Sequence, residues 1–304
     1  MVVSGGILVA LDGSAAAEAA LPYAQLLARA QRRRLLLVRA VGIVEGGEVD
    51  RAALHGAEAY LAAVAGRLMT GTAVEAVTFA GQPEAAILAE ARLRRVGLIA
   101  MAVDPRSPAW GALRGVTTQA VLAAADVPTL FVPVRSDAMP TPLPIQSRRI
   151  LIPLDGSIFA EAALPVGLSL AHALSVGVLL LYCVAPVAVA TSPAGRPSGA
   201  SGRGVSLGAT EGGAYLAAQQ ARLRRLEPGV PVTITVGQGP PGEQIVRAAT
   251  EHNVLLVTMA THGGSGSHGT LLGSVAADVL QQGVVPQLLV RPSGAEMKPA
   301  VYVA

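Results

Sequence analysis

The sequence predicts an α/β protein built from two copies of one doubly wound domain. Its 304 residues are roughly twice the length of a typical domain. A segment near the start returns in the second half, and short apolar runs alternate with amphipathic stretches in both halves. Strands that alternate with helices in this way form parallel sheets joined by right-handed crossovers.

The repeat extends over several blocks that occur in the same order in both halves. Each block keeps the same or closely similar residues, with longer spacings in the second half. The blocks are ILVALDGS (7–14) and ILIPLDGS (150–157), AEAALP (17–22 and 160–165), YLAA (60–63 and 215–218) and Met-Ala (101–102 and 259–260). A duplicated domain is therefore expected before any single motif is considered.

The elements of the first half follow from its apolar runs and its alanine-rich stretches. The run LLLV at 35–38 is apolar without alternation, as expected for a strand covered on both faces. Strands are predicted at 6–11, 34–41, 73–79, 97–102 and 128–133, and helices at 15–31, 48–69, 83–94 and 113–125. Each half is thus expected to form a five-stranded parallel sheet with helices on both faces, a Rossmann-like arrangement that binds ligands beyond the carboxyl ends of its strands.

Changes in composition set the expected domain limits. The first domain is expected at 1–135, a proline-containing linker at 136–147, the second domain at 148–292 and a tail at 293–304. The segment 191–213 makes the second half longer than the first. Because it is rich in Gly, Ser and Pro, it is predicted to be a mobile loop.

The composition excludes several classes of protein. With 52% apolar and 14% charged residues the chain is not intrinsically disordered, and a single cysteine, Cys183, rules out a disulfide scaffold. The net charge of +3 indicates no strong nucleic-acid footprint, and the arginine run 32–34 is interpreted as a solvated turn. The longest apolar run, 176–190, is interrupted by Pro186 and is shorter than the ~20 residues that span a membrane. We expect a cytoplasmic protein with neither nucleic acid nor a membrane as partner.

A glycine-rich loop at 259–274 (MATHGGSGSHGTLLGS) carries the clearest chemical signal. It follows an apolar strand and leads into a helical pattern, so its backbone N–H groups and the helix N-terminus form a candidate anion site. A Walker loop is excluded because the only lysine, Lys298, lies near the C-terminus. The string Gly264-x-Gly266-x-x-Gly269 matches a dinucleotide fingerprint, but it follows the fourth strand of its half rather than the first.

The spacing of this loop resembles that of the universal stress proteins. Nucleotide-binding members of that family carry Gly-x-x-Gly, nine residues, and then Gly followed by Ser or Thr. Gly263, Gly273 and Ser274 match this pattern, and Ala260 replaces the first glycine. The resemblance covers 7–134 and 150–290, so the chain is identified as a tandem member with an adenine nucleotide alpha hydrolase-like fold. It also implies that the edge strands of the two halves pair with each other.

The resemblance implies a nucleotide site in the second half. The Asp155 side chain and the Val184 backbone would hold the nucleoside, and Ala260 would approach the ribose. Amides of the loop and the Ser274 hydroxyl would hold the phosphates of ATP, with Mg²⁺ or Mn²⁺ bridging phosphate oxygens and no metal ligand from the protein. The predicted binding residues are Asp155, Val184, Ala260, Gly263, Gly273 and Ser274.

The first half departs from this pattern at the phosphate side. Pro105 and Val116 replace the second glycine and the serine, and Asp104 adds a negative charge. Proline removes an amide donor, and valine removes a hydroxyl. The first half is therefore interpreted as a degenerate domain without triphosphate binding, in which Asp12 forms only a turn and helix cap.

Three functions stay open at this point. The first is an ATP-binding regulatory module of the stress response, which acts through unidentified protein partners and forms a homodimer. The second is a slow ATPase, although no catalytic arrangement is visible near the loop. The third is a scaffold that binds no nucleotide. This hypothesis is suggested by Ala260, which replaces a glycine of the nucleotide-binding pattern.

Overall fold

The computed structural model describes residues 5–43, 49–68, 71–104, 116–134, 148–184, 208–261 and 272–292. By packing, the chain divides into one unit of residues 1–146 with 280–290 and a second of residues 147–279 with 291–304. We call them unit 1 and unit 2. The domain limits expected from the repeat stay a prediction, and the expected linker and tail lie almost wholly outside the described residues.

Unit 1 contains a parallel sheet with the strand order β3-β2-β1-β4-β5, and β10 follows β5 in antiparallel orientation. The pairing of β5 with β10, centred on Leu130 and Leu288, confirms that the last strands of the two repeats pair. Its elements are β1 (Ile7–Ala10), a short 3₁₀ helix (Ala17–Ala20), α1 (Leu21–Ala30), β2 (Leu35–Val41), α2 (Arg51–Arg67), β3 (Val74–Ala80), α3 (Pro83–Leu93), β4 (Leu98–Val103), α4 (Val116–Ala124), β5 (Thr129–Pro133) and β10 (Gln287–Val290).

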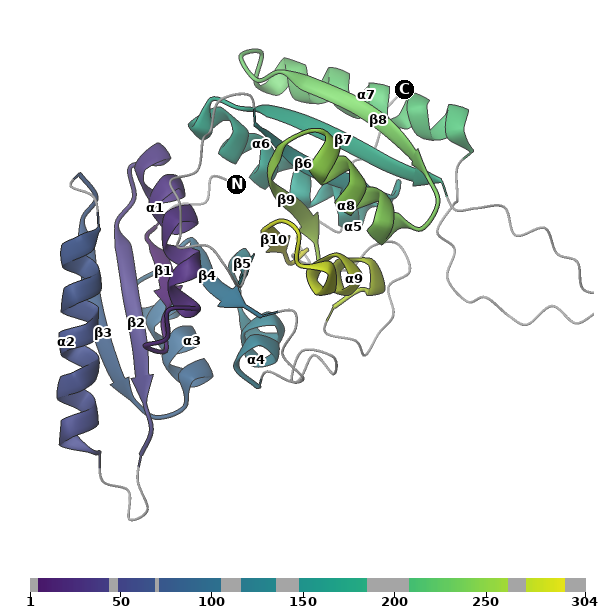
Figure 1. The fold of residues 1–304 in the computed structure, drawn as a ribbon. Coiled ribbons are helices and arrows are strands. Elements are labelled where there is room, and N and C mark those ends of the chain that lie inside the picture. The colour runs from purple at the N-terminus through teal and green to yellow at the C-terminus, as the bar shows by residue number, and fades with distance from the viewer. Residues whose placement is uncertain are drawn as a thin grey trace, which may run out of the picture. The chain divides into compact units, whose positions relative to one another are not determined.

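Unit 2 repeats this pattern with the parallel strand order β9-β6-β7-β8 (Figure 1). Its elements are β6 (Arg149–Leu154), α5 (Ile158–Glu161), α6 (Ala163–Leu174), β7 (Gly177–Val184), α7 (Ala209–Leu226), β8 (Val232–Gln238), α8 (Pro241–Glu251), β9 (Val254–Ala260) and the beginning of α9 (Ser274–Gln282). The predicted α/β class and the tandem repeat are confirmed. The predicted loop at 191–213 is wrong for 209–213, which form the first turns of α7; 191–207 lie outside the described residues.

The central strands are buried on both faces, as their continuous apolar sequences predict. Ile7, Leu8 and Val9 of β1 are fully buried, and so are the corresponding residues of β6. Glycines bring two helices close to the second sheet. A Cβ at Gly167 or Gly212 would lie 2.5 Å from the side chain of Ile152 or Tyr182, respectively. Within the described ranges, no helix combines the length and apolar character needed to cross a membrane.

A polar cluster ties the segment after the first strand to the helix after the second strand in unit 2. The Glu161 carboxylate of α5 accepts hydrogen bonds from Tyr215 Oη (3.0 Å), Gln219 Nε2 (2.8 Å) and Arg222 Nη1 (3.3 Å) of α7. Burial, followed by the negative charge of Glu161, raises the pKa of Tyr215 above its ordinary range. The phenol therefore remains a neutral hydrogen-bond donor at neutral pH.

Part of this cluster occurs at the repeated positions of unit 1, where Val64 stands in place of Gln219. Both carboxylate oxygens of Glu18 accept from Arg67 Nη2 at 2.9 Å. Burial, followed by the charge of Glu18, raises the pKa of Tyr60 to about 12. Because both copies keep a glutamate, a tyrosine and an arginine in contact, we conclude that this cluster stabilises the fold.

Replacing Glu161 by Ala is expected to lower the free energy of unfolding by about 2–3 kcal/mol, because buried donors lose their charged acceptor. Urea denaturation followed by circular dichroism measures this change. The control is Glu251→Ala, since Glu251 is exposed and has only a 3.6 Å ion pair with Arg247. That control should change stability by less than about 0.5 kcal/mol. Equal effects of the two substitutions would show that the cluster has no special role.

Candidate functional site

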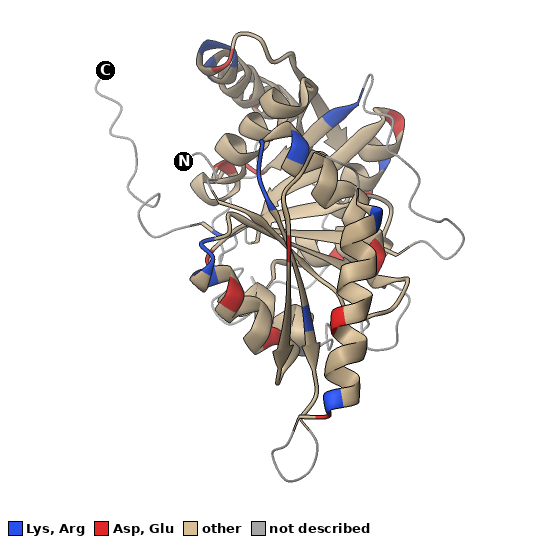
Figure 2. Ribbon diagram, turned by 90° about the vertical axis from the view of Figure 1, so that its left-hand side faces the viewer, with Lys and Arg blue, Asp and Glu red and all other residues tan. Residues whose placement is uncertain are grey.

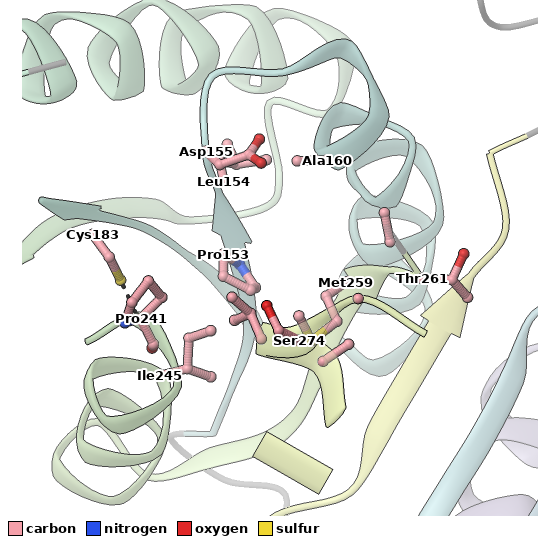
Figure 3. A pocket seen from close by; sticks show the side chains of 14 residues that line it. Pro153, Leu154, Asp155, Ala160, Cys183, Pro241, Ile245, Met259, Thr261 and Ser274 are labelled. Carbon is pink, nitrogen blue, oxygen red and sulfur yellow. Dashed lines mark hydrogen bonds between the residues drawn. The ribbon is translucent and has the colours of Figure 1, made fainter. Parts of the chain in front are cut away.

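A pocket opens in unit 2 at the carboxyl ends of β6, β7 and β9 (Figure 3). Its empty volume is about 690 Å³, including the open solvent at its mouth. Tyr182 of β7 packs against Gly212 of α7, whereas the next residue, Cys183, contacts Pro241 of α8, so the pocket lies on the α8 side of the sheet. Neighbouring strands β6 and β9 have their crossovers on opposite faces, which is where doubly wound sheets bind ligands.

Asp155 follows β6 directly and lines the pocket. Its Oδ1 accepts hydrogen bonds from Ser157 N (2.9 Å) and Ser157 Oγ (2.6 Å), and Ser157 in turn caps α5 through Ala160 N (3.2 Å). Gly156 has a φ of 82°, which only glycine adopts without strain. The local sequence Asp-Gly-Ser therefore presents the carboxylate at the mouth of the pocket.

The corresponding turn in unit 1 has the same geometry. Asp12 Oδ1 accepts from Ser14 N (2.8 Å), and Ser14 Oγ accepts from Ala17 N (3.1 Å). The turn interpreted for Asp12 is present, whereas the short 3₁₀ helix that follows has Ala16 at its N-cap and no side-chain cap. However, a Cβ at Gly13 would lie 2.6 Å from Arg39 Nη2, so an arginine packs directly against this turn.

Val184 ends β7, as predicted, but Cys183 rather than Val184 lines the pocket. The Val184 carbonyl oxygen accepts a hydrogen bond from Gly239 N at 3.0 Å, so one of its lone pairs already has a donor. Burial raises the pKa of the Cys183 thiol to about 11. The thiol is thus neutral at neutral pH and forms part of an apolar wall with Ile245.

On the side of the pocket predicted to bind phosphates, one hydrogen bond joins the residues before and after the glycine-rich segment. Gly273 N donates to the Thr261 carbonyl at 2.8 Å, and Ala277 N donates to the Gly273 carbonyl at 3.0 Å. The amide of Gly273 is therefore already used, contrary to its predicted role as an anion donor. Gly263 lies outside the described residues, so its role stays a prediction.

The first turn of α9 instead supplies the amides that face the pocket. Ser274, Val275 and Ala276 precede the first helical donor, Ala277, so their N–H groups have no acceptor within the helix. All three residues line the pocket together with Ala260, which is only 7% exposed. Such a helix start attracts anions through its amides and its dipole.

Sequence reasoning missed Pro153, Cys183, Pro241 and Ile245 of the pocket wall. Pro153 offered a signal, because proline is unusual in a central strand. The register of β6 with β9 runs to Leu151, and Pro153 lies beyond it, where a missing N–H is tolerated. No comparable sequence signal marks Ile245 in the middle of a helix.

The described residues around the pocket form no metal cage. Among the described residues, no three His, Cys, Asp or Glu side chains are grouped as a metal site requires. His262 and His268 lie outside the described ranges. A divalent cation at this pocket would depend on ligand oxygens and water.

Comparison with known proteins gives a consistent result. The model of the Universal stress protein family matches residues 5–133 and 146–291. The universal stress proteins MT2698 and Rv2623 of Mycobacterium tuberculosis are each 28% identical over 185 residues, covering 60% of this chain and 57% of the relative.

Solved structures show the same fold over nearly the whole chain. A universal stress protein from Archaeoglobus fulgidus DSM 4304 has a TM-score of 0.68 at 19% identity, covering 96% of this chain and 97% of that one. A putative universal stress protein from Pseudomonas aeruginosa UCBPP-PA14 has a TM-score of 0.62 at 18% identity, covering 96% and 95%. At these identities the likeness concerns the fold alone.

The raised pKa of Cys183 predicts slow alkylation of the only cysteine in the chain. At pH 8 the thiolate fraction should be about one hundredth of that of an ordinary thiol, because each pKa unit is tenfold. Iodoacetamide labelling followed by mass spectrometry should show a rate that rises until the pH passes about 11. The urea-unfolded chain is the control and should label with an ordinary profile. A native profile identical to the unfolded one would contradict the assigned burial.

Proposed function

Since this chain belongs to the universal stress protein family as a tandem member, we propose that it is a regulatory protein that binds ATP in unit 2. The observation that carries the proposal is the convergence of Asp155 and the first turn of α9 on one pocket. A carboxylate that accepts from ribose hydroxyls and a helix start that donates to phosphates are the two polar ends that a nucleotide requires. The carboxylate and the helix start both lie at the carboxyl edge of the sheet, where neighbouring strands have their crossovers on opposite faces.

The apolar part of the wall fits a nucleobase. Pro153, Cys183 and Ile245 offer no charge, and the neutral thiol preserves this character at physiological pH. In the proposal the base lies against these residues, the ribose lies near Asp155 and Ala260, and the phosphates point toward Ser274. Mg²⁺ or Mn²⁺ would then be held by phosphate oxygens and water.

Unit 1 is proposed to lack this activity. Asp104 follows β4 where phosphates would approach, and Arg39 packs against the Asp12 turn. The Arg39 guanidinium also lies 5.0 Å from the centre of the Tyr60 ring. This side chain occupies the space beside the turn that a nucleoside would need.

A scaffold without nucleotide is the second candidate. It is favoured by the methyl group of Ala260 in the pocket wall and by the engagement of the Gly273 amide with Thr261. An ATPase has less support, because Asp155 is the only acidic side chain in the wall of this pocket. A location in the cytoplasm, a homodimer and unidentified protein partners are proposals that rest on the family alone.

Titration calorimetry of the full chain with ATP and Mg²⁺ is expected to show one site per chain. Ser274→Pro removes an amide and the hydroxyl at the first helical position, where proline is tolerated. ATP affinity should fall by roughly tenfold to a hundredfold, as expected for hydrogen bonds to a charged group. Adenosine affinity should not change, because adenosine has no phosphate.

Two further variants make this test specific. Ala209→Pro places proline at the first position of α7, remote from the pocket wall, and should leave ATP binding unchanged. Asp155→Ala should weaken adenosine and ATP alike. Absence of ATP binding in the wild type, or equal binding by Ser274→Pro, would favour the scaffold. Hydrolysis that disappears with Asp155→Ala would instead support an enzyme.

A further inference from the structure

Unit 1 carries a concentration of arginines at the amino-terminal edge of its sheet. They lie at the ends of α1 and α3 and in the turns that lead into β2 and β4. We call this group the arginine edge; it consists of Arg29, Arg32, Arg33, Arg34, Arg92, Arg94 and Arg95. The two turns flank the same backbone segment, because Ile7 N donates to the Arg34 carbonyl and Gly97 N donates to the Gly6 carbonyl. Arg34 Nη2 also donates to the Arg94 carbonyl at 3.1 Å, so the two turns are in direct contact.

The duplicated chain provides an internal comparison for this surface. None of the seven repeated positions in unit 2 carries an arginine. The corresponding residues are His172, Ser175, Val176, Gly177, Thr250, His252 and Asn253. Unit 2 instead has Arg148 and Arg149 at the positions of Gly5 and Gly6. The arginine edge is therefore a property of unit 1 and not a requirement of the fold.

Two of these arginines occupy backbone positions that disfavour them. Arg32 has a φ of 52° and Arg95 a φ of 49°, and the repeated positions Ser175 and Asn253 have φ values of 55° and 52°. A left-handed residue after a helix is usually Gly or Asn, because other side chains crowd the backbone there. Arginine at these two positions lowers the stability of the fold. We infer that the role of these arginines is to supply positive charge.

Three arginines of this edge have no acidic partner among the described residues. Glu75 is held between Arg34 Nη1 (2.6 Å) and Arg94 Nη1 (2.7 Å). Among the described residues, Arg32, Arg33 and Arg95 form no ion pair. Arg32 and Arg95 are exposed.

Arg33 is half-buried, and its Nη1 is fully buried without a hydrogen-bond acceptor among the described residues. Burial lowers the pKa of its guanidinium. The expected solvated turn at 32–34 is thus wrong for Arg33 and Arg34, both of which are partly buried. The exposed cations Arg32 and Arg95, which form no ion pair among the described residues, leave this surface able to bind acceptors from outside the chain.

Charge elsewhere in the unit is mixed in sign. Along α2, Arg51, Glu58 and Arg67 are spaced along the helix, and Arg67 already pairs with Glu18. Figure 2 shows basic and acidic positions interspersed along the helices. Within the described residues, ion pairs join arginines of this edge to Glu75, Glu90 and Asp126. This edge is therefore a local positive surface on a chain whose net charge is only +3.

We propose that the arginine edge of unit 1 docks an acidic segment of a protein partner. Guanidinium groups form strong charge-assisted hydrogen bonds with carboxylates, and Glu75 already accepts one from Arg34 and one from Arg94. The three carboxylates within the edge would repel a continuous phosphate backbone. Separately placed carboxylates of a peptide can instead reach the cations that lack a partner. This site is independent of the nucleotide pocket.

The probe is a fluorescein-labelled peptide in which glutamate alternates with glycine. Its binding to the full chain is measured by fluorescence anisotropy at about 0.15 M ionic strength, where the Debye length is about 8 Å. The double variant Arg32→Ser with Arg95→Asn installs the residue types of unit 2 at the two left-handed positions. It should weaken peptide binding by about tenfold or more, while the melting temperature rises. A higher melting temperature shows that the variant is folded, so weaker peptide binding is then not caused by damage to the fold.

The matched control is Arg51→Ser with Arg225→Asn, which removes the same charge from exposed helical positions. The control should bind the peptide within about twofold of the wild type, because charges far from the patch are screened. Equal weakening by both double variants would overturn the proposal, because it would show a net-charge effect. Absence of peptide binding by the wild type, or binding of a single-stranded DNA oligonucleotide but not the peptide, would also overturn it.

Discussion

Parallel pairing of buried strands is the constraint on which the rest of the structure depends. Each parallel connection requires a crossover helix, and each crossover directs a helix start toward the carboxyl edge of the sheet. In unit 2 this places the first turn of α9 beside the turn that follows β6. The hydrogen bond from Gly273 N to the Thr261 carbonyl then fixes where α9 begins. The pocket, the position of the Asp155 carboxylate and the amides of the first turn of α9 that lack a partner within the helix all follow from that arrangement.

Duplication shows which features serve the fold and which differ between the units. Both units keep the Asp-Gly-Ser turn and a glutamate that pairs with an arginine of the helix after the second strand. They differ at the two edges of the sheet. The sequence of unit 2 keeps a nearly complete glycine motif after β9, whereas unit 1 has an arginine-rich amino-terminal edge. We infer two separate tasks: nucleotide binding by unit 2 and partner docking by unit 1.

The sequence predicted elements well where burial alone decides them. The expected strand at 34–41 is observed as Leu35–Val41, because a continuous apolar run between polar turns fits only a strand covered on both faces. Asp155 was found because its turn has a fixed local signature. Val184 and Gly273 were identified by family resemblance, but their backbone partners, Gly239 and Thr261, depend on packing between distant segments. Cys183 and Ile245 could not be found from sequence, because a pocket wall depends on how strand and helix faces meet.

The central claim is that the first turn of α9 receives the phosphates of a nucleotide bound beside Asp155. Amide chemical shifts of the ¹⁵N-labelled chain during titration with ATP and with adenosine test it most directly. We expect ATP to shift the amides of Ser274, Val275 and Ala276, adenosine to leave them nearly unchanged, and neither ligand to shift Ser14 in unit 1. Shifts confined to unit 1, or no shift at these three amides at saturating ATP, would contradict the claim.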